Sequence, residues 1–400
     1  MNASKRVPLY LMMLIVALPQ LSETIYTPSL PAIAAALHTT ANWVEHTLTI
    51  YLLGFACGVF LWGTLSDRFG RKPGLFWGLG MYALASLGCF FSTTITMLMA
   101  MRFLQAFGAS TGSVLGQAIA RDSSSLAERG KLFSTISLVL AFAPAVGPSI
   151  GSTVEGFAGL QGIFLALIAL AAIVMTLIAL QLPETHTAAS KSSNFFVLIK
   201  EILPRVSSDI RLLMSGVLIG GVNGILFGYY AEAPFYFKKM LGVPDHLFGM
   251  LSMYVVLPLA AGSLISRALH NRGWQADSIS LMGVRTILGC GALFYAAACL
   301  PIVHMPLVYT VVSMLCVGGT MTGLTMVIPN VLGQALERYK ENAGTAASLF
   351  GLYYYIWISL FTGLMAVLHN GTLQRLPLFF VIIGISLMVA YKIGGFGRRA

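Results

Sequence analysis

The chain has 400 residues, of which 57% are hydrophobic and only 10% are charged, and its net charge is +10. Soluble domains carry about 25% charged residues. A chain this long and this apolar cannot cover its surface with polar groups. This composition excludes an ordinary soluble protein and favours a lipid bilayer as the solvent.

Long apolar runs, separated by short polar loops, follow one another along the whole chain. A membrane-spanning helix needs about 20 predominantly apolar residues, so the chain has room for roughly twelve. The predicted spans are 7–36, 45–66, 73–92, 95–120, 132–156, 160–183, 211–237, 246–266, 278–300, 305–335, 344–368 and 373–393. We therefore expect an all-α integral membrane protein with twelve transmembrane helices in two six-helix bundles, 1–183 and 211–400, joined by a cytoplasmic linker at 184–210.

Lysine and arginine are distributed unevenly between the two sets of loops. With a cytoplasmic N-terminus, the inner segments hold 19 of the 24 Lys and Arg residues, the outer loops hold three, and Arg102 and Arg285 fall inside spans. This asymmetry supports an even number of spans and places both termini in the cytoplasm. The inner segments also carry nine acidic residues, so their excess of ten explains the net charge without a nucleic-acid partner.

The sequence patterns of catalysis, ATP binding and metal binding are missing. No G-x-x-x-x-G-K-[ST] or G-x-S-x-G pattern occurs, and the seven histidines lie in loops or at span ends without a cluster at ligand spacing. We therefore predict that the protein is not an enzyme and has no catalytic residues, no metal and no cofactor. Transport driven by an ion gradient becomes the leading class of function.

Two carboxylates lie inside predicted spans next to prolines. Glu23 is deep in span 1, ahead of Pro28 and Pro31, and Glu232 lies in span 7 ahead of Pro234. Prolines break the hydrogen-bond ladder of a helix, and transporters build their sites at broken helices. A carboxyl in such a place is desolvated, which disfavours its charged form and suits it to proton exchange. The structural alternatives are a carboxyl bonded to a neighbouring helix for Glu23 and a water-exposed rim carboxyl for Glu232.

Arg102 lies about 10 Å inside the outer face of span 4, at 1.5 Å per residue. The residues that follow it on one stripe are small or polar: Ala106, Ala109, Ser113 and Gln117. Such a stripe faces protein or a water-filled cavity, so an arginine there can pair with a carboxylate and shift its protonation. Snorkelling toward the outer face is the alternative. Glu155 and Arg285 lie near span ends, where both reach water.

The loop after span 2 is expected to latch one conformation, and span 5 carries a face of small residues. In the loop, contacts with a helix dipole or a neighbouring arginine would latch one state. The predicted loop residues are Gly63, Asp67, Arg68, Gly70 and Arg71. In span 5, Gly147 and Gly151 lie on one face and let another helix approach closely, while Pro148 bends the span. Segment 262–267 looks like an eroded copy of the loop and supports a duplicated six-helix unit.

Together these residues resemble the major facilitator superfamily. Gly63 to Lys72 is similar to its G-x-L-x-D-R-x-G-R-K loop motif, Leu98-x-x-x-Arg102-x-x-Gln105 to its span 4 motif, and Gly147-Pro148-x-x-Gly151 to the span 5 motif of its antiporter branch. Segments 25–31 and 343–348 resemble the bicyclomycin-resistance (Bcr/CflA) subgroup of twelve-span drug:proton antiporters. The resemblance covers the whole chain and implies two pseudo-symmetric six-helix bundles around a central cavity, working by alternating access.

The resemblance also implies roles for individual residues. Arg102 would couple to a carboxyl of span 1, span 5 would form the interface between the bundles, and Asp67 would dock on span 11 near Gly344. The subgroup's span 1 acid corresponds to Thr24 here, and Glu23 is one residue away, about 100° around the helix. The sequence leaves open whether Glu23 replaces that acid.

A cavity of this kind would gather carboxylates, amides and aromatic rings. The predicted substrate-binding residues are Glu23, Tyr26, Gln117, Asn223, Tyr229, Tyr230, Glu232, Tyr353, Tyr354 and Trp357. The predicted proton-coupling residues are Glu23, Arg102 and Glu232. Aromatic faces with a few carboxylates suit apolar or cationic ligands. Packing of these rings against lipid or other helices is the structural alternative.

The predicted function is proton-coupled export of small amphiphilic compounds or drugs across a bacterial inner membrane. The expected partners are a small-molecule substrate, protons and the lipid bilayer, with a proton gradient in place of a cofactor and a monomeric state. One alternative is a dedicated exporter or importer of one endogenous metabolite, such as a siderophore or an amino acid, because motifs report fold more than ligand. Another is a non-transporting membrane sensor, against which the buried charges and the span 5 motif count.

Overall fold

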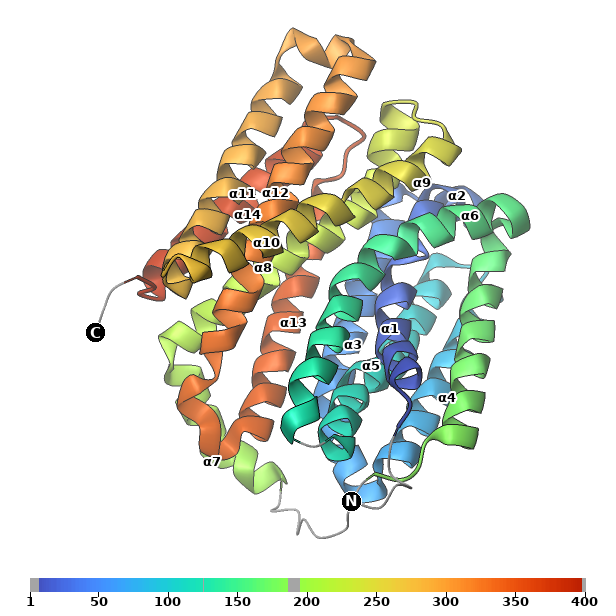
Figure 1. Cartoon of the computed structure of the whole chain (residues 1–400). Helices are drawn as coiled ribbons and strands as arrows, with labels where there is room; N and C mark the ends of the chain where they lie inside the picture. The colour runs from blue at the N-terminus through green and yellow to red at the C-terminus, as the bar shows by residue number, and fades with distance from the viewer. Residues whose placement is uncertain (1–6, 125, 186–194, 398–400) are drawn as a thin grey trace. The chain divides into compact units, whose positions relative to one another are not determined.

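The computed structural model describes residues 7–124, 126–185 and 195–397, and all regular structure in these ranges is helical (Figure 1). The first half contains α1 (Leu9–Thr24), α2 (Leu30–Ala36), α3 (Ala41–Phe69), α4 (Arg71–Phe90), α5 (Ile95–Ser123) and α6 (Leu126–Gln181). The helix α7 (Phe195–Ser208) lies in the predicted linker. The second half contains α8 (Ile210–Ala233), α9 (Asp245–Tyr254), α10 (Val256–Asn271), α11 (Ala276–Cys299), α12 (Pro306–Ala335), α13 (Ala343–Leu368) and α14 (Arg375–Ile393).

The number of spanning segments agrees with the twelve predicted from the sequence when α5 and α6 are taken into account. Ten helices among the described residues are long and apolar enough to cross a membrane. Helix α5 is long enough but is less apolar, because it carries Arg102, Arg121, Asp122 and many small polar residues. Helix α6 is one of these ten helices, although it covers both predicted spans 5 and 6. The two spans meet at Gly159, whose backbone is not helical (φ 66°, ψ −171°). With α5 added and α6 divided there, the twelve-helix membrane fold is confirmed.

Span 1 is broken where its prolines predict. Helix α1 ends at Thr24, a 3-10 turn η2 (Thr27–Ser29) follows, and α2 continues the span. Pro28 has no N–H to bond the carbonyl of Thr24, and that oxygen instead accepts a hydrogen bond from Thr27 Oγ1 at 2.9 Å. Glu23 therefore lies in the last turn before a break in the backbone ladder.

The helices form two compact units, which we describe separately. Unit 1 contains the described residues of Met1–Thr39 and Ile50–Ile199, and unit 2 contains those of Thr40–Thr49 and Lys200–Ala400. The first turns of α3 group with unit 2 because Asn42 Nδ2 donates to the Ala366 carbonyl at 2.7 Å and Ser359 Oγ donates to the Thr49 carbonyl at 2.9 Å. The domain limits at 183 and 211 remain a prediction.

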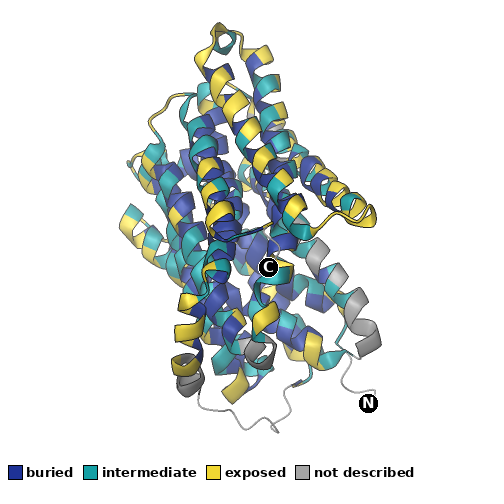
Figure 2. Cartoon of the chain, turned by 90° about the vertical axis from the view of Figure 1, so that its left-hand side faces the viewer, coloured by how far each residue is buried: buried dark blue, intermediate teal, exposed yellow. Residues whose placement is uncertain are grey.

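Within each unit the helices bury one face and expose another (Figure 2). Large apolar side chains such as Leu84 and Leu307 are exposed on the outward faces, as suits contact with lipid tails. The inward faces use small residues for close approach: a Cβ on Gly147 would lie 2.0 Å from Thr24 Oγ1 in unit 1, and one on Gly220 would lie 2.3 Å from Trp357 in unit 2. Glycine thus sets the α1–α6 and α8–α13 contacts.

We expect Gly151→Ala to destabilise unit 1. A Cβ at this position would lie 1.9 Å from the Ile25 carbonyl oxygen, so α1 and α6 must move apart. Overpacking of this kind costs about 1–3 kcal/mol. Gly156→Ala in the same helix is the matched control, because a Cβ there meets no described atom within 4 Å. Thermal unfolding in detergent should show a lower midpoint for Gly151→Ala alone, and equal midpoints would contradict this contact.

Candidate functional site

Glu23 is buried at the end of α1, with only 1% of its surface exposed. Neither carboxylate oxygen has a hydrogen-bond partner among the described residues. The neighbouring Thr24, where the resembled subgroup has its acid, packs against Gly147 of α6, and a Cβ on Gly151 would meet the Ile25 carbonyl. Glu23 and Thr24 therefore lie in different surroundings, and the unpaired carboxyl belongs to Glu23.

Arg102 is completely buried on α5. Its Nη1 donates to Gln105 Oε1 at 2.6 Å, and its guanidinium lies 4.4 Å from the ring centre of Tyr26 and 4.1 Å from that of Tyr51. Two aromatic faces and one amide thus compensate the cation. Its Nε and Nη2 have no hydrogen-bond partner in the described part of the chain.

Glu23 and Arg102 share one electrostatic environment in unit 1. The charge of Arg102 acts on the Glu23 carboxyl, and the hydroxyl of Tyr51 interacts with both charges. Tyr82 donates to Ser22 Oγ at 3.0 Å and closes the same region from α4. The Glu23 carboxyl has unused hydrogen-bonding atoms and lies in the field of a permanently charged guanidinium, so this carboxyl can take up and release a proton or bind a cation.

The loop between α3 and α4 is held by Arg71. Its side chain forms ion pairs with Asp67 at 2.6 Å and with Asp122 of α5 at 3.2 Å, and it donates to Ser66 Oγ at 2.6 Å. Arg71 thereby ties the ends of three helices together. The predicted docking of Asp67 on span 11 near Gly344 stays a prediction.

Gly70 and Glu184 complete this loop. Gly70 has φ +100°, which L side chains rarely adopt. The next two backbone N–H groups, of Arg71 and Lys72, donate to Glu184 Oε1 at 3.0 Å and Oε2 at 3.1 Å. Glu184 thus satisfies the first N–H groups of α4 from the far end of the first half, and its charge suits the positive end of that helix. Sequence reasoning missed it, because an acid in a linker gives no sign of which helix it will meet.

Glu232 lies in unit 2 beside two residues that the sequence did not single out. His369 Nδ1 is 2.6 Å from Glu232 Oε2 and 2.9 Å from Glu45 Oε1. Glu45 and Glu232 are almost fully buried, which rules out the water-exposed rim carboxyl as a description of Glu232. Glu45 is the first residue of predicted span 2. Its position at the end of a span was the sequence feature that could have indicated a functional acid here.

The charge state of His369 reflects these neighbours. Burial lowers its pKa, but the hydrogen bond to Glu232 and the two carboxylate charges raise it, and the net result is a pKa of about 10. The ring also packs edge-on against Phe235 at 5.2 Å between centres. One nitrogen and two carboxylate oxygens, all within 4.8 Å of one another, form a group that could hold a metal ion. The expectation of no metal rested on histidine spacing, which does not detect a group with a single histidine.

The predicted aromatic residues of unit 2 contact neighbouring helices and rings. Tyr353 and Trp357 of α13 cover Gly216 and Gly220 of α8. Tyr229 and Tyr230 are buried, with ring centres 5.7 Å apart, and the Tyr230 hydroxyl has no hydrogen-bond partner among the described residues. Tyr354 contacts the rings of Phe350 and Tyr355, and Asn223 donates to the Ile219 carbonyl at 2.9 Å. In unit 1, Tyr26 is engaged by Arg102 and Gln117 is half-buried.

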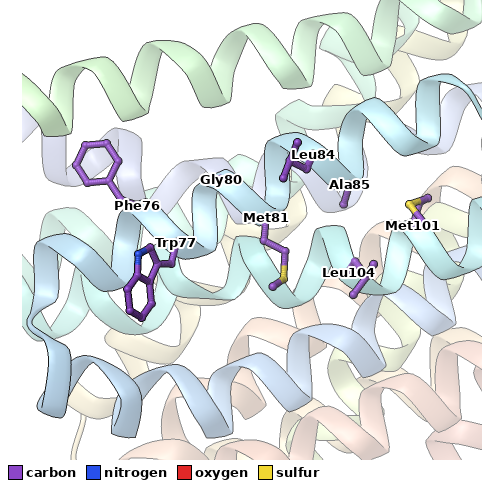
Figure 3. Close-up of a pocket in the computed structure, with 8 residues that line it drawn as sticks. All are labelled: Phe76, Trp77, Gly80, Met81, Leu84, Ala85, Met101 and Leu104. Atoms are coloured by element: carbon purple, nitrogen blue, oxygen red, sulfur yellow. The ribbon is translucent and has the colours of Figure 1, made fainter.

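A shallow groove of about 590 Å³ lies on unit 1 between α4 and α5 (Figure 3). Its lining is almost wholly apolar: Phe76, Trp77, Gly80, Met81, Leu84, Ala85, Met101 and Leu104. None of the predicted substrate-binding residues lines it. Exposed Trp77 and Leu84 on this face suit contact with lipid tails.

The chain is a multi-pass membrane protein with buried ionisable groups at helix breaks, and the family and relatives given next make it a membrane transport protein and not an enzyme. The chain belongs to the Major Facilitator Superfamily, whose family model matches residues 12–362. This confirms the resemblance carried by the loop, span 4 and span 5 motifs. A small-molecule substrate and the membrane lipids are the partners that this family implies.

Three relatives illustrate the range of similar proteins. An "Uncharacterized transporter" of Rickettsia bellii (strain RML369-C) is 33% identical over 98% of this chain and 97% of its own length. The "Multidrug resistance protein D" of Escherichia coli (strain K12) is 26% identical over 98% of this chain and 96% of its own. The "Bicyclomycin resistance protein homolog" of Haemophilus influenzae (strain ATCC 51907 / DSM 11121 / KW20 / Rd) is 29% identical over 84% of this chain and 82% of its own.

The fold matches that of a solved transporter. The crystal structure of a D-xylose-proton symporter superposes with a TM-score of 0.72, covering 95% of this chain and 96% of that one. The two sequences are only 13% identical, so the match establishes the shared fold alone.

We expect Glu184→Ala to destabilise the start of α4. The change removes the acceptors of two N–H groups, and losing a helix cap costs about 0.5–2 kcal/mol. Glu184→Gln keeps one acceptor oxygen, so its unfolding midpoint should lie between those of the unmodified protein and Glu184→Ala. Glu201→Ala, on the exposed face of α7, is the control. Thermal unfolding in detergent would measure all three, and an unchanged midpoint for Glu184→Ala would show that the cap is unimportant.

Proposed function

We propose that this protein is a proton-coupled antiporter that exports small amphiphilic compounds or drugs from a bacterial cell by alternating access. It would lie in the inner membrane with both termini in the cytoplasm and act as a monomer. The proton gradient would take the place of a cofactor, and no nucleic acid would take part.

The observation that carries this proposal is the buried Glu23 carboxyl beside Arg102. Neither group is saturated with hydrogen bonds in the described part of the chain. An ionised Glu23 attracts the guanidinium, and a protonated Glu23 does not, so proton uptake changes the forces between α1 and α5. Since Glu23 directly precedes the break in α1, such a change acts where the backbone ladder is already interrupted.

The names of the relatives support the class of substrate. The proteins named for multidrug and bicyclomycin resistance are similar to this chain over most of its length. Cationic and apolar drugs suit a site with a carboxylate and aromatic rings. The residues that we propose to reach the substrate are Glu23, Tyr26, Gln117, Asn223, Tyr229, Tyr230, Glu232, Tyr353, Tyr354 and Trp357.

We expect Glu23→Gln to abolish substrate-evoked proton movement. The amide keeps the size of the side chain but cannot ionise, so a coupling carboxyl should lose at least about tenfold in rate, which corresponds to 1.4 kcal/mol. Proteoliposomes with a pH-sensitive dye, challenged with lipophilic cations, antibiotics and metabolites, would measure it against Glu201→Gln on exposed α7. Full proton movement in Glu23→Gln would remove this residue from coupling. A bound compound that moves no protons in the unmodified protein would overturn antiport.

Arg102→Lys should impair transport although it keeps the charge. Lysine cannot stack a flat cation on Tyr26 and Tyr51 while donating to Gln105, so its charge would sit differently toward Glu23. We expect a loss of roughly tenfold or more in transport rate. Arg285→Lys, at an exposed position of α11, is the matched control. Equal rates for both variants in the same vesicles would show that charge alone suffices at position 102.

A further inference from the structure

Three buried side chains of unit 2 converge from segments far apart in the sequence. Glu45 lies in the first turns of α3, Glu232 in the last turn of α8, and His369 directly after α13. The imidazole Nδ1 is 2.6 Å from Glu232 Oε2 and 2.9 Å from Glu45 Oε1, and side-chain exposure is 0%, 1% and 9% for Glu45, Glu232 and His369. This group lies outside the Glu23–Arg102 pair, and its binding chemistry does not depend on the coupling proposed above.

The cluster consists of two acids and one imidazole. The charged groups that act on Glu45 are Glu232 and His369. Among the described residues, both Glu45 oxygens and Glu232 Oε1 lack a hydrogen bond of normal geometry, although the Glu45 carboxylate is close to the ring. Buried carboxylate oxygens without such a bond are costly, and one divalent cation between them would supply the missing partner.

The donor atoms define the class of cation. One imidazole nitrogen and two carboxylate oxygens suit Zn²⁺, Co²⁺ and Mn²⁺, whereas Mg²⁺ and Ca²⁺ prefer oxygen ligands alone and Cu⁺ prefers sulfur. Bonds of about 2.0–2.2 Å require ligand atoms about 3–3.5 Å apart, so small side-chain rotations from the present separations would admit the ion. Three protein ligands leave a position for water, which suits an exchangeable ion.

Neighbouring contacts hold the ligands in place. Asn42 Nδ2, one turn before Glu45, donates to the His369 carbonyl at 2.9 Å and to the Ala366 carbonyl at 2.7 Å. Phe235 packs edge-on against the His369 ring. These contacts join the start of α3 to the end of α13 and orient the imidazole. Support of this kind from outside the ligand set is typical of metal sites.

We propose that Glu45, Glu232 and His369 bind one exchangeable divalent transition-metal ion of the Zn²⁺ class. In the predicted topology all three lie at outer ends of spans, so the ion would arrive from outside the cell. Binding would hold α3, α8 and α13 together at this point. It would also occupy Glu232, so that the metal competes with any substrate or proton at that carboxyl.

The test is titration of the full chain with ZnCl₂ alone by isothermal calorimetry, in detergent, after purification on a tag without histidine. We expect one ion per chain, and Glu45→Gln, Glu232→Gln and His369→Gln should each weaken binding by at least about tenfold. His304→Gln, at an exposed turn, should not. Millimolar Mg²⁺ should not displace Zn²⁺.

A second measurement keeps the test decisive if a variant does not fold. Co²⁺ bound to the unmodified protein should give visible absorption bands of a low-coordinate nitrogen and oxygen site, and Zn²⁺ should remove them. Absence of stoichiometric binding to the unmodified protein would overturn the proposal. So would binding that survives in all three folded variants, or that is lost equally in His304→Gln. None of these outcomes depends on transport.

Discussion

The structure depends on one constraint: inside a bilayer, every polar or charged group must find its partner within the protein. Arg102 meets this constraint in part: two tyrosine rings and one glutamine amide contact its guanidinium, while Nε and Nη2 have no hydrogen-bond partner among the described residues. Glu23, by contrast, is buried and unpaired among the described residues. The imbalance between these two groups, which interact through their charges, is the reason why we propose that unit 1 responds to a proton or a cation.

Both halves place an acid at the same kind of position. Glu23 lies in the last turn of α1 before Pro28, and Glu232 lies in the last turn of α8 before Pro234, which begins a π-helical turn, η3 (Pro234–Met240). A proline removes one N–H and loosens the ladder, so the helix can deform there without losing further backbone bonds. The two acids nevertheless meet different partners: an arginine in unit 1, and a histidine with a second carboxylate in unit 2.

Small residues determine where these groups end up. Gly147 and Gly151 let α6 contact the α1 backbone beside Glu23, and Gly216 and Gly220 let α8 accept the aromatic rings of α13. At the loop between α3 and α4, few side chains make the connections. The Arg71 guanidinium joins α3, α4 and α5, and the Glu184 carboxylate accepts hydrogen bonds from the first backbone N–H groups of α4. Close approach of helix backbones, rather than packing of large apolar side chains, thus determines where the charged residues lie.

The sequence by itself determined the class of solvent, the twelve spans and the break in span 1, and it singled out Glu23 and Arg102 as ionisable residues within spans. These follow from local rules: apolar length, proline chemistry and the cost of charge in lipid act on each segment separately. The partners were decided by tertiary structure. Glu45, His369 and Glu184 stand at ends of predicted spans, where water is the default partner, and only helix packing buries Glu45 with Glu232 or brings Glu184 to α4. Likewise, the contacts of Tyr353 and Trp357 with Gly216 and Gly220 are decided by the packing of α13 against α8. Contacts between residues more than a hundred positions apart depend on the geometry of several helices at once, which no local pattern encodes.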